Sequence, residues 1–366
     1  MLREGLRLNG VEVIECHHSL WDGIEDKSQV HGMGRWLKLA TNALFAYPRL
    51  ILRYLRAPRH DVVLVAYPGL LDLFVLRPFA WLRRTPLAWD WFLSAYDTIV
   101  LDRRMVSRRN PLAWLIRAVE WTAARLADSV FMDTAAHARR MELLFGLPAH
   151  RVERVWVGAE ESIFSEITST TGSPDCAQPD RNTTVLFYGQ FIPLHGIPTI
   201  IEAAQLLRDE DISWTLVGRG QEAPHIRELL QSAGLPKLQW IEWLEYGSLR
   251  DAMQRADVVL GIFGTSEKAA SVIPNKVFQT LMTQRPLITR DSPAIRELIR
   301  HSPPSIQLVP AGDAAALAEA VMTVRNSRVY SSELPILAFE PFDTAAIGRQ
   351  LLEVLQQRTP AGRYET

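Results

Sequence analysis

The sequence predicts an α/β protein with two Rossmann-like domains joined by a linker. Short apolar runs alternate with longer helical stretches along the 366 residues, which is typical of parallel strands buried on both faces beneath helices. Residues 165–183 interrupt this alternation with a polar stretch rich in turn-forming residues, as linkers do. We therefore predict a first domain over 1–165, a linker over 166–182, a second domain over 183–340, and a C-terminal helix and tail over 341–366.

Apolar runs rich in β-branched and aromatic residues mark the expected strands. These strands are 11–15, 61–67, 86–91, 129–134, 154–158, 184–189, 213–218, 238–243, 257–263, 286–290 and 305–310. Helices are expected over 197–208, 223–232, 275–282 and 344–357, followed by a frayed tail at 361–366.

The first domain opens without the strand that normally starts a Rossmann fold. Such a domain begins with a strand, a glycine-bearing turn and a helix, whereas residues 2–9 here read as a helix and 11–15 as the second strand. Either the fold departs from the norm or translation begins upstream of Met1. We favour the upstream start, and expect about 15–25 further residues, the length of one strand and its turn, to complete the sheet.

Charge is unevenly distributed along the chain, although the net charge is only −1. Residues 1–160 carry 22 basic and 17 acidic side chains, and the remainder carries 18 and 24. Between His31 and His60, six basic residues and no acidic residue interleave with apolar ones. This segment is either a solvated helix face or a surface that meets anionic lipid. Nucleic acid is a less suitable partner, because no nucleic-acid motif accompanies the neutral overall charge.

Cysteine usage and hydropathy indicate a cytoplasmic protein, and the basic segment between His31 and His60 leaves open a peripheral location on the inner face of the cell membrane. Cys16 and Cys176 are the only cysteines, too few for a zinc site or a disulfide framework of their own. The sequence has no apolar run long enough for a spanning helix, and its first ten residues lack the apolar core of a signal peptide.

Three loops that follow expected strands carry candidate phosphate ligands. In the first, the strand ends at Gly189, and Gln190, His195 and Gly196 lead into a helix. Such a turn aims backbone N–H groups and the positive helix end at an anion. An ordinary βα turn would explain the two glycines equally well.

The second loop carries Gly218 and Gly220, a weak signal alone. The third places Asn275 and Lys276 in the first turn of a helix, with Gln279 one turn further on the same face. A lysine in a first turn opposes the helix dipole. That placement is reasonable if Lys276 faces an anionic ligand; the alternative is a solvated surface lysine.

The segment from Leu186 to Leu298 resembles the retaining glycosyltransferases of family 4, and shares with them the strand–glycine loop, the VGRG turn and the PNK…Q…RPLIT segment in order. The earlier part of the chain matches more loosely over 90–103, 127–141 and 151–164. The resemblance implies the GT-B fold, in which two Rossmann-like domains face each other across a cleft. It also implies a nucleotide sugar held by the second domain, an acceptor held by the first, and no metal or other cofactor.

The sequence departs from the family at the donor ligands. Many members have an arginine and a lysine where this chain has Gln190 and His195, and two glutamates where it has Ser271 and Gln279. An amide binds a ribose diol less strongly than a carboxylate does. We expect Lys276 to supply the phosphate-binding cation instead.

Three further residues are candidates on the acceptor or sugar side. Asp90 ends a strand, and either orients the acceptor or caps a helix. His137 follows another strand, and either touches the donor sugar or caps a helix. Glu267 lies in the polar loop of the third motif, near the expected donor site.

These observations predict a glycosyltransferase that moves a sugar from a nucleotide-diphosphate donor to a glycan or lipid-linked acceptor with retention of configuration. One alternative is a nucleotide-sugar epimerase on the same fold, for which His195 and Glu267 are the available acid/base groups. The other is a non-catalytic GT-B binding protein, which the lost charged ligands favour.

Overall fold

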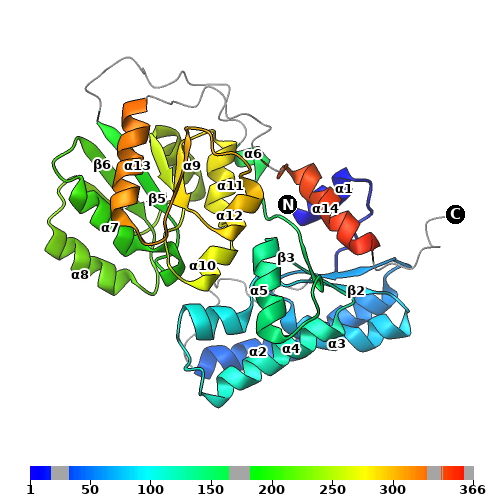
Figure 1. The fold of residues 1–366 in the computed structure, drawn as a ribbon. Coiled ribbons are helices and arrows are strands. Elements are labelled where there is room, and N and C mark those ends of the chain that lie inside the picture. The colour runs from blue at the N-terminus through cyan, green and yellow to red at the C-terminus, as the bar shows by residue number, and fades with distance from the viewer. Residues whose placement is uncertain (18–32, 165–181, 328–338, 340, 358–366) are drawn as a thin grey trace. The chain divides into compact units, whose positions relative to one another are not determined.

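The computed structural model describes residues 1–17, 33–164, 182–327, 339 and 341–357. The chain forms two compact units (Figure 1). We call one the N-terminal unit: Leu6–Met132, Met141–Arg154 and Gly348–Thr366. The other, the C-terminal unit, comprises Met1–Gly5, Asp133–Arg140 and Val155–Ile347.

Two predicted features lie wholly or almost wholly outside the described residues. One is the linker over 166–182, of which only Asn182 is described, and the other is the frayed tail at 361–366. The predicted domain boundaries therefore stay a prediction.

The N-terminal unit is built on a four-stranded parallel sheet in the order β1-β2-β3-β4. Because this spatial order follows the sequence, right-handed crossovers place the connecting helices on one face, where Figure 1 shows α3 and α4. The strands are β1 (Val63–Val65), β2 (Leu87–Asp90), β3 (Ser129–Met132) and β4 (Val152–Arg154), and the helices are α2 (Met33–Arg56), α3 (Leu70–Leu82), the π-helix η2 (Tyr96–Asp102) and α4 (Pro111–Leu126). Two further helices, α1 (Leu2–Leu8) and α5 (Ala135–Phe145), are each divided between the two units.

The predicted strand at 11–15 is wrong. This segment has no regular secondary structure, with Val11 and Val13 half-buried and Glu12 and Ile14 exposed, and among the described residues it pairs with no strand. The preceding helix is confirmed as α1, and the basic segment between His31 and His60 forms α2. The strand predicted at 154–158 shares only Arg154 with β4.

The C-terminal unit contains a six-stranded parallel sheet in the order β10-β9-β8-β5-β6-β7. This is the doubly wound order, in which the chain starts centrally and builds outward on each side. All six strands predicted here are confirmed, the first two displaced by one residue and the other four shorter: β5 (Thr183–Tyr188), β6 (Ile212–Val217), β7 (Leu238–Ile241), β8 (Val258–Leu260), β9 (Leu287–Arg290) and β10 (Ile306–Val309).

Helices cover the C-terminal sheet, and its central strands are apolar because both faces are buried. Val185, Phe187, Leu216, Val258 and Leu260 form one continuous core. The helices are α6 (Glu161–Phe164), the 3-10 helix η4 (Pro193–His195), α7 (Ile197–Leu206), α8 (Ala223–Ala233), α9 (Tyr246–Arg255), α10 (Glu267–Ser271), α11 (Asn275–Met282), α12 (Pro293–Leu298) and α13 (Ala314–Ser327). The last helix, α14 (Thr344–Gln356), begins in this unit, and its residues from Gly348 onward belong to the N-terminal unit. Over the described part of the chain, no helix is long and apolar enough to cross a membrane.

Candidate active site at the switch point of the C-terminal sheet

The strand order of the C-terminal sheet reverses between β5 and β8. In doubly wound sheets the connections leave such a pair of strands in opposite directions, which opens a crevice at their carboxyl ends and makes it the usual ligand site. Gly189 follows β5 and Gly261 follows β8. The fold therefore places the first predicted loop at the position where a ligand is expected.

Two predicted glycines, Gly189 and Gly218, pack against each other where β5 and β6 end. Their φ angles are 144° and 148°, which side-chain-bearing residues rarely adopt. A Cβ on Gly218 would lie 1.8 Å from the carbonyl oxygen of Gly189. Backbone packing therefore requires Gly218, whether or not a phosphate binds here.

Gly196 and Gly220 also sit at close backbone contacts. A Cβ on Gly220 would lie 2.6 Å from the carbonyl oxygen of Phe191, and one on Gly196 would lie 2.5 Å from the backbone nitrogen of Gly264. Gly196 has a φ of 64° and is the N-cap of α7. Both glycines thus have a structural explanation beside the predicted donor role.

The Lys276 side chain extends from α11 to Gly189, on the side where a Cβ would lie in any other residue. A Cβ on Gly189 would lie 2.9 Å from the Lys276 amine and 3.0 Å from the His195 ring. The structure thus brings together three residues that are separated in the sequence. The amine lies 3.8 Å from the centre of the Phe187 ring and 3.5 Å from the Gly261 carbonyl oxygen, to which it donates a hydrogen bond.

The Lys276 amine is buried without an acidic partner. The residue is 5% exposed, and no carboxylate in the described part of the chain pairs with it. Burial lowers the pKa of Lys276 well below the ordinary lysine value. A buried cation without a counter-charge is costly, and an incoming phosphate would supply that charge.

His195 is held by the loop that it closes. Its Nδ1 is hydrogen-bonded to the carbonyl oxygen of Gln190, and its ring packs edge-on against Phe187 with centroids 5.6 Å apart. His195 is 7% exposed. Gln190 therefore orients His195 through its backbone carbonyl, so this contact does not depend on which side chain residue 190 carries.

Gln279 lies within a hydrogen-bonded chain that leads away from Lys276. Its Oε1 accepts from the Tyr188 hydroxyl at 2.7 Å, its Nε2 donates to the Tyr246 hydroxyl at 3.1 Å, and Tyr246 donates to Glu160 at 2.6 Å. Burial raises the pKa of both tyrosines. The amide of Gln279 thus holds internal partners at the place where the family resemblance implies a ribose ligand.

Glu267 and Asn275 lie at the starts of the two helices that follow β8. Asn275 is an exposed first residue of α11. Glu267 begins α10; its side chain is 85% exposed and its carboxylate lies 3.7 Å from the Arg140 guanidinium. Arg290 on β9 holds the loop before α10 by donating to the carbonyl oxygen of Gly264.

His137 belongs to the part of α5 that is included in the C-terminal unit. Its ring is fully buried, with Nδ1 2.6 Å from a carboxylate oxygen of Asp133. Its Nε2 is buried and finds no hydrogen-bond partner among the described residues. The neighbouring Thr134 hydroxyl donates to the Ser271 carbonyl oxygen, which joins the residue before α5 to the end of α10.

In the N-terminal unit, Asp90 ends β2 and is half-buried, and its Oδ2 accepts from the Tyr67 amide at 3.4 Å. The loop after it is fixed by Glu120, a residue that the sequence analysis missed. The Glu120 carboxylate is fully buried and accepts hydrogen bonds from the Trp91 ring, the Ser94 hydroxyl and the amides of residues 95 and 96, at 2.7–3.1 Å. Burial raises its pKa.

A further pair at the carboxyl edge of the C-terminal sheet was also missed. Trp243 follows β7 and is 60% exposed, and the Arg219 guanidinium lies 5.3 Å from the centre of its ring. Arg219 stands between Gly218 and Gly220. An aromatic residue at the end of a predicted strand was the available signal, because the strand ends at this edge of a doubly wound sheet converge on the ligand.

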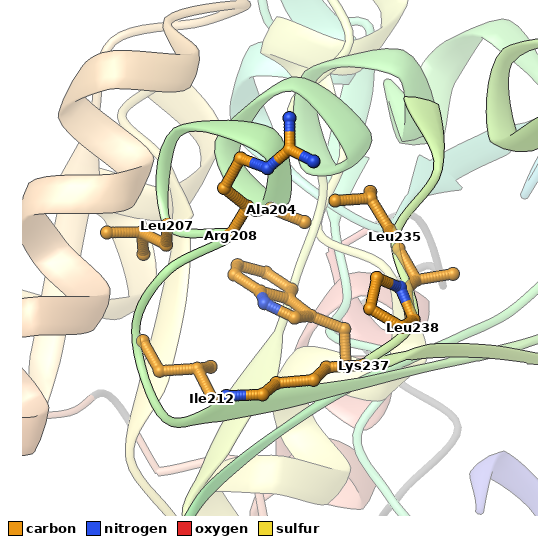
Figure 2. Close-up of a pocket in the computed structure, with 9 residues that line it drawn as sticks. Ala204, Leu207, Arg208, Ile212, Leu235, Lys237 and Leu238 are labelled. Carbon is orange, nitrogen blue, oxygen red and sulfur yellow. The ribbon is translucent and has the colours of Figure 1, made fainter. Parts of the chain in front are cut away.

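The hollow drawn in Figure 2 lies elsewhere on this unit. It is lined by residues at the amino ends of β6 and β7, including Ile212 and Leu238. Its volume is about 10 Å³, which is room for one water molecule. It is therefore no substrate site.

Comparison with known proteins identifies the class of the C-terminal unit. The family described as Glycosyl transferases group 1 matches residues 182–327, so the chain carries a glycosyltransferase domain. Two curated relatives are the colanic acid biosynthesis glycosyl transferase WcaI of Escherichia coli (strain K12), 28% identical over 103 residues, and a phosphatidyl-myo-inositol mannosyltransferase of Mycobacterium leprae (strain TN), 24% identical over 205 residues. The matches cover 28% and 54% of this chain, and 25% and 52% of the relatives.

Solved structures confirm the GT-B fold class. HepE of Anabaena, crystallised with UDP and glucose, matches with a TM-score of 0.61 at 16% identity, over 85% of this chain and 81% of that one. The sucrose-phosphate synthase of Thermosynechococcus elongatus matches with a TM-score of 0.60 at 15% identity, over 92% and 78%. The fold class inferred from the sequence, with two Rossmann-like units, is therefore correct.

Proposed function

We propose that the protein transfers a sugar from a nucleoside-diphosphate sugar to a glycan or lipid-linked acceptor, with retention of configuration. The observation that carries the proposal is the Lys276 amine, buried without a carboxylate at the switch point of the glycosyltransferase domain. Retention of configuration is supported by the resemblance to family 4.

Lys276 has a distinct role in this reaction. Glycosyl transfer breaks the bond between the sugar and the diphosphate, and negative charge develops on the departing oxygen. A cation preorganised in a site of low dielectric stabilises such charge strongly. Lys276 is held in place by α11 beside Gly189, so it replaces the charges absent at Gln190 and His195.

The nucleobase has a candidate platform in Trp243 and Arg219. An exposed indole ring beside a guanidinium offers stacking and cation–π contacts to a base. HepE is described in complex with UDP-glucose, which supports a uridine nucleotide as donor for this chain as well. Gln279 is not required as a ribose ligand in this arrangement.

The acceptor side is assigned to the N-terminal unit, as the family resemblance implies. Asp90 ends β2 beside a loop that Glu120 fixes with four hydrogen bonds, which gives an acceptor ligand a rigid support. The names of the two relatives indicate a polysaccharide pathway in one case and a phosphoinositide substrate in the other. A glycan carried on a lipid is compatible with both.

Calorimetric titration with UDP tests the donor site. Lys276→Met should weaken binding by about 1.5–3 kcal/mol, the range for a hydrogen bond to a charged group, and should reduce release of UDP from UDP-glucose in the presence of acceptor. Lys237→Met is the matched control, since Lys237 is an exposed lysine paired with Asp211. If the two variants bind UDP equally well, Lys276 is not the phosphate ligand.

The two alternative functions predict different outcomes for the same protein. An epimerase converts the donor sugar without any acceptor. A non-catalytic binding protein retains UDP affinity but releases no UDP from UDP-sugars under any condition. Acceptor-dependent release of UDP that Lys276→Met abolishes supports the transferase over both.

A further inference from the structure

The N-terminal unit carries a stretch of arginines without an exposed acid. Residues 103–126 contain six arginines and a single acidic residue, Glu120, which is 1% exposed. Arg104, Arg108 and Arg109 are exposed, and no carboxylate in the described part of the chain pairs with them. The exposed charge of this stretch is therefore entirely positive.

Large apolar side chains emerge from the same stretch, on the face of α4 that turns away from the sheet. Trp114 is 68% exposed and Trp121 43% exposed, and their separation of seven residues places them on one stripe of the helix. Arg125 continues this stripe, with its guanidinium 3.8 Å from the centre of the Trp121 ring. A single exposed leucine is common on protein surfaces, but two exposed tryptophans flanked by arginines indicate an interaction site.

The apolar surface extends from α4 to the end of α5. Arg117 donates to the carbonyl oxygen of Leu144 at 3.0 Å, and Arg125 to that of Gly146 at 2.9 Å, so the two helices are neighbours. Leu143 on α5 is 85% exposed. The combined surface is thus an apolar band edged by arginines that are partly fixed in position.

An open hollow lies beside this band, before the start of α4. It has a volume of about 300 Å³ and is lined by Val100, Leu101, Arg104, Val106, Ser107 and Arg108. Two guanidinium groups and a hydroxyl over an apolar floor match a phosphate ester attached to hydrocarbon.

We propose that α4 and the 103–109 loop form a docking surface for an anionic phospholipid bilayer, with the hollow receiving a lipid phosphate. Tryptophan is suited to the membrane interface because its ring is apolar and its N–H is polar, and arginine is attracted to anionic headgroups. Nucleic acid fits this surface less well. A nucleic-acid-binding domain carries a strongly basic patch, whereas this surface exposes leucines and the whole chain is nearly neutral. The proposal is independent of the proposed function, since it invokes none of the donor-site residues.

Sedimentation with vesicles of phosphatidylglycerol and phosphatidylcholine tests the proposal on the full chain. Binding to these vesicles should exceed binding to pure phosphatidylcholine, and should fall as salt is raised. Arg108→Gln with Arg109→Gln should weaken it about 30-fold, because each basic residue near the surface contributes about 1 kcal/mol. The matched control is Leu206→Ser with Arg208→Gln, which changes an exposed leucine and arginine of the C-terminal unit.

Two further variants locate the contact. Quenching of tryptophan fluorescence by brominated lipid should drop in Trp114→Phe with Trp121→Phe, although binding persists because the arginines remain. Arg49→Gln with Arg56→Gln alters exposed arginines of α2, within the basic segment that the sequence analysis considered. If the α2 variant abolishes binding while the α4 and loop variants keep wild-type binding and quenching, the proposal is overturned. Equal binding to neutral and anionic vesicles would overturn it too.

Discussion

At the scale of single residues, the sequence alone drew attention to Lys276, which the structure buries, but it gave no sign of the partners of Gln279. A lysine in the first turn of a helix is unfavourable, and that local conflict indicated an anionic ligand before any tertiary contact was known. The two tyrosines that form hydrogen bonds with Gln279 come from β5 and α9, so only the folded chain brings them to its amide. The family resemblance implied a ribose ligand at Gln279, and it gave no sign of those tyrosines.

Lys276 should give the protein a pH-dependent stability that a methionine removes. Burial lowers the pKa of Lys276 in the folded state, while an unfolded lysine keeps a pKa of about 10.4. Between these two values the unfolded chain holds one more proton, so the free energy of unfolding rises with pH, by at most about 1.4 kcal/mol per pH unit. Below the lowered pKa the amine is charged in both states and the slope disappears.

Urea unfolding of Lys276→Met over a pH series measures this effect. The variant should be more stable than the wild type at neutral pH, because it no longer buries an unpaired amine, and its stability should lose the rising slope. Lys237→Met should keep the slope, since Lys237 is exposed. Parallel curves for the wild type and Lys276→Met would show that Lys276 is not perturbed by burial.

At the scale of elements, the buried strands of the C-terminal sheet were predicted correctly, and the strand predicted at 11–15 was not. Most of the six predicted strands of the C-terminal sheet are continuous apolar runs, and all six formed. Val11–Glu15 mixes apolar and polar residues, so it needs a neighbouring strand to hold its apolar side, and no strand of the described residues pairs with it. A local pattern cannot report whether such a neighbour exists.

Gly218, in the turn after β6, should not tolerate replacement by any residue with a side chain. A Cβ there meets the Gly189 carbonyl oxygen at 1.8 Å, and φ is 148°. Gly218→Ala should therefore destabilise the protein by about 3 kcal/mol or more, combining backbone strain with steric overlap. Gly247→Ala in α9 meets nothing within 4 Å and should instead stabilise by about 0.4–1 kcal/mol. Denaturant midpoints compare the two, and equal shifts would contradict the packing account.

At the scale of the whole molecule, the sequence indicated which part of the chain is basic, but not which surface of the fold carries the unpaired positive charge. The excess of basic residues in 1–160 drew attention to the segment between His31 and His60, because an acid-free run is visible in a linear sequence. Residues 103–126 escaped notice because Glu120 interrupts their basic run. Only the fold shows that this carboxylate is buried and leaves the surface of α4 uniformly positive.

If the C-terminal unit binds the donor and α4 binds the membrane, variants of the two surfaces should fail in different assays. Arg108→Gln with Arg109→Gln should bind UDP as the wild type does and transfer normally to a water-soluble acceptor glycan. It should lose most transfer to a lipid-linked acceptor in anionic vesicles, because its local concentration at the bilayer falls. Lys276→Met should lose transfer to both acceptors while sedimenting with vesicles like the wild type. Loss of soluble-acceptor transfer in the arginine variant would mean that the 103–109 loop belongs to the acceptor site, and that the two surfaces are not separable.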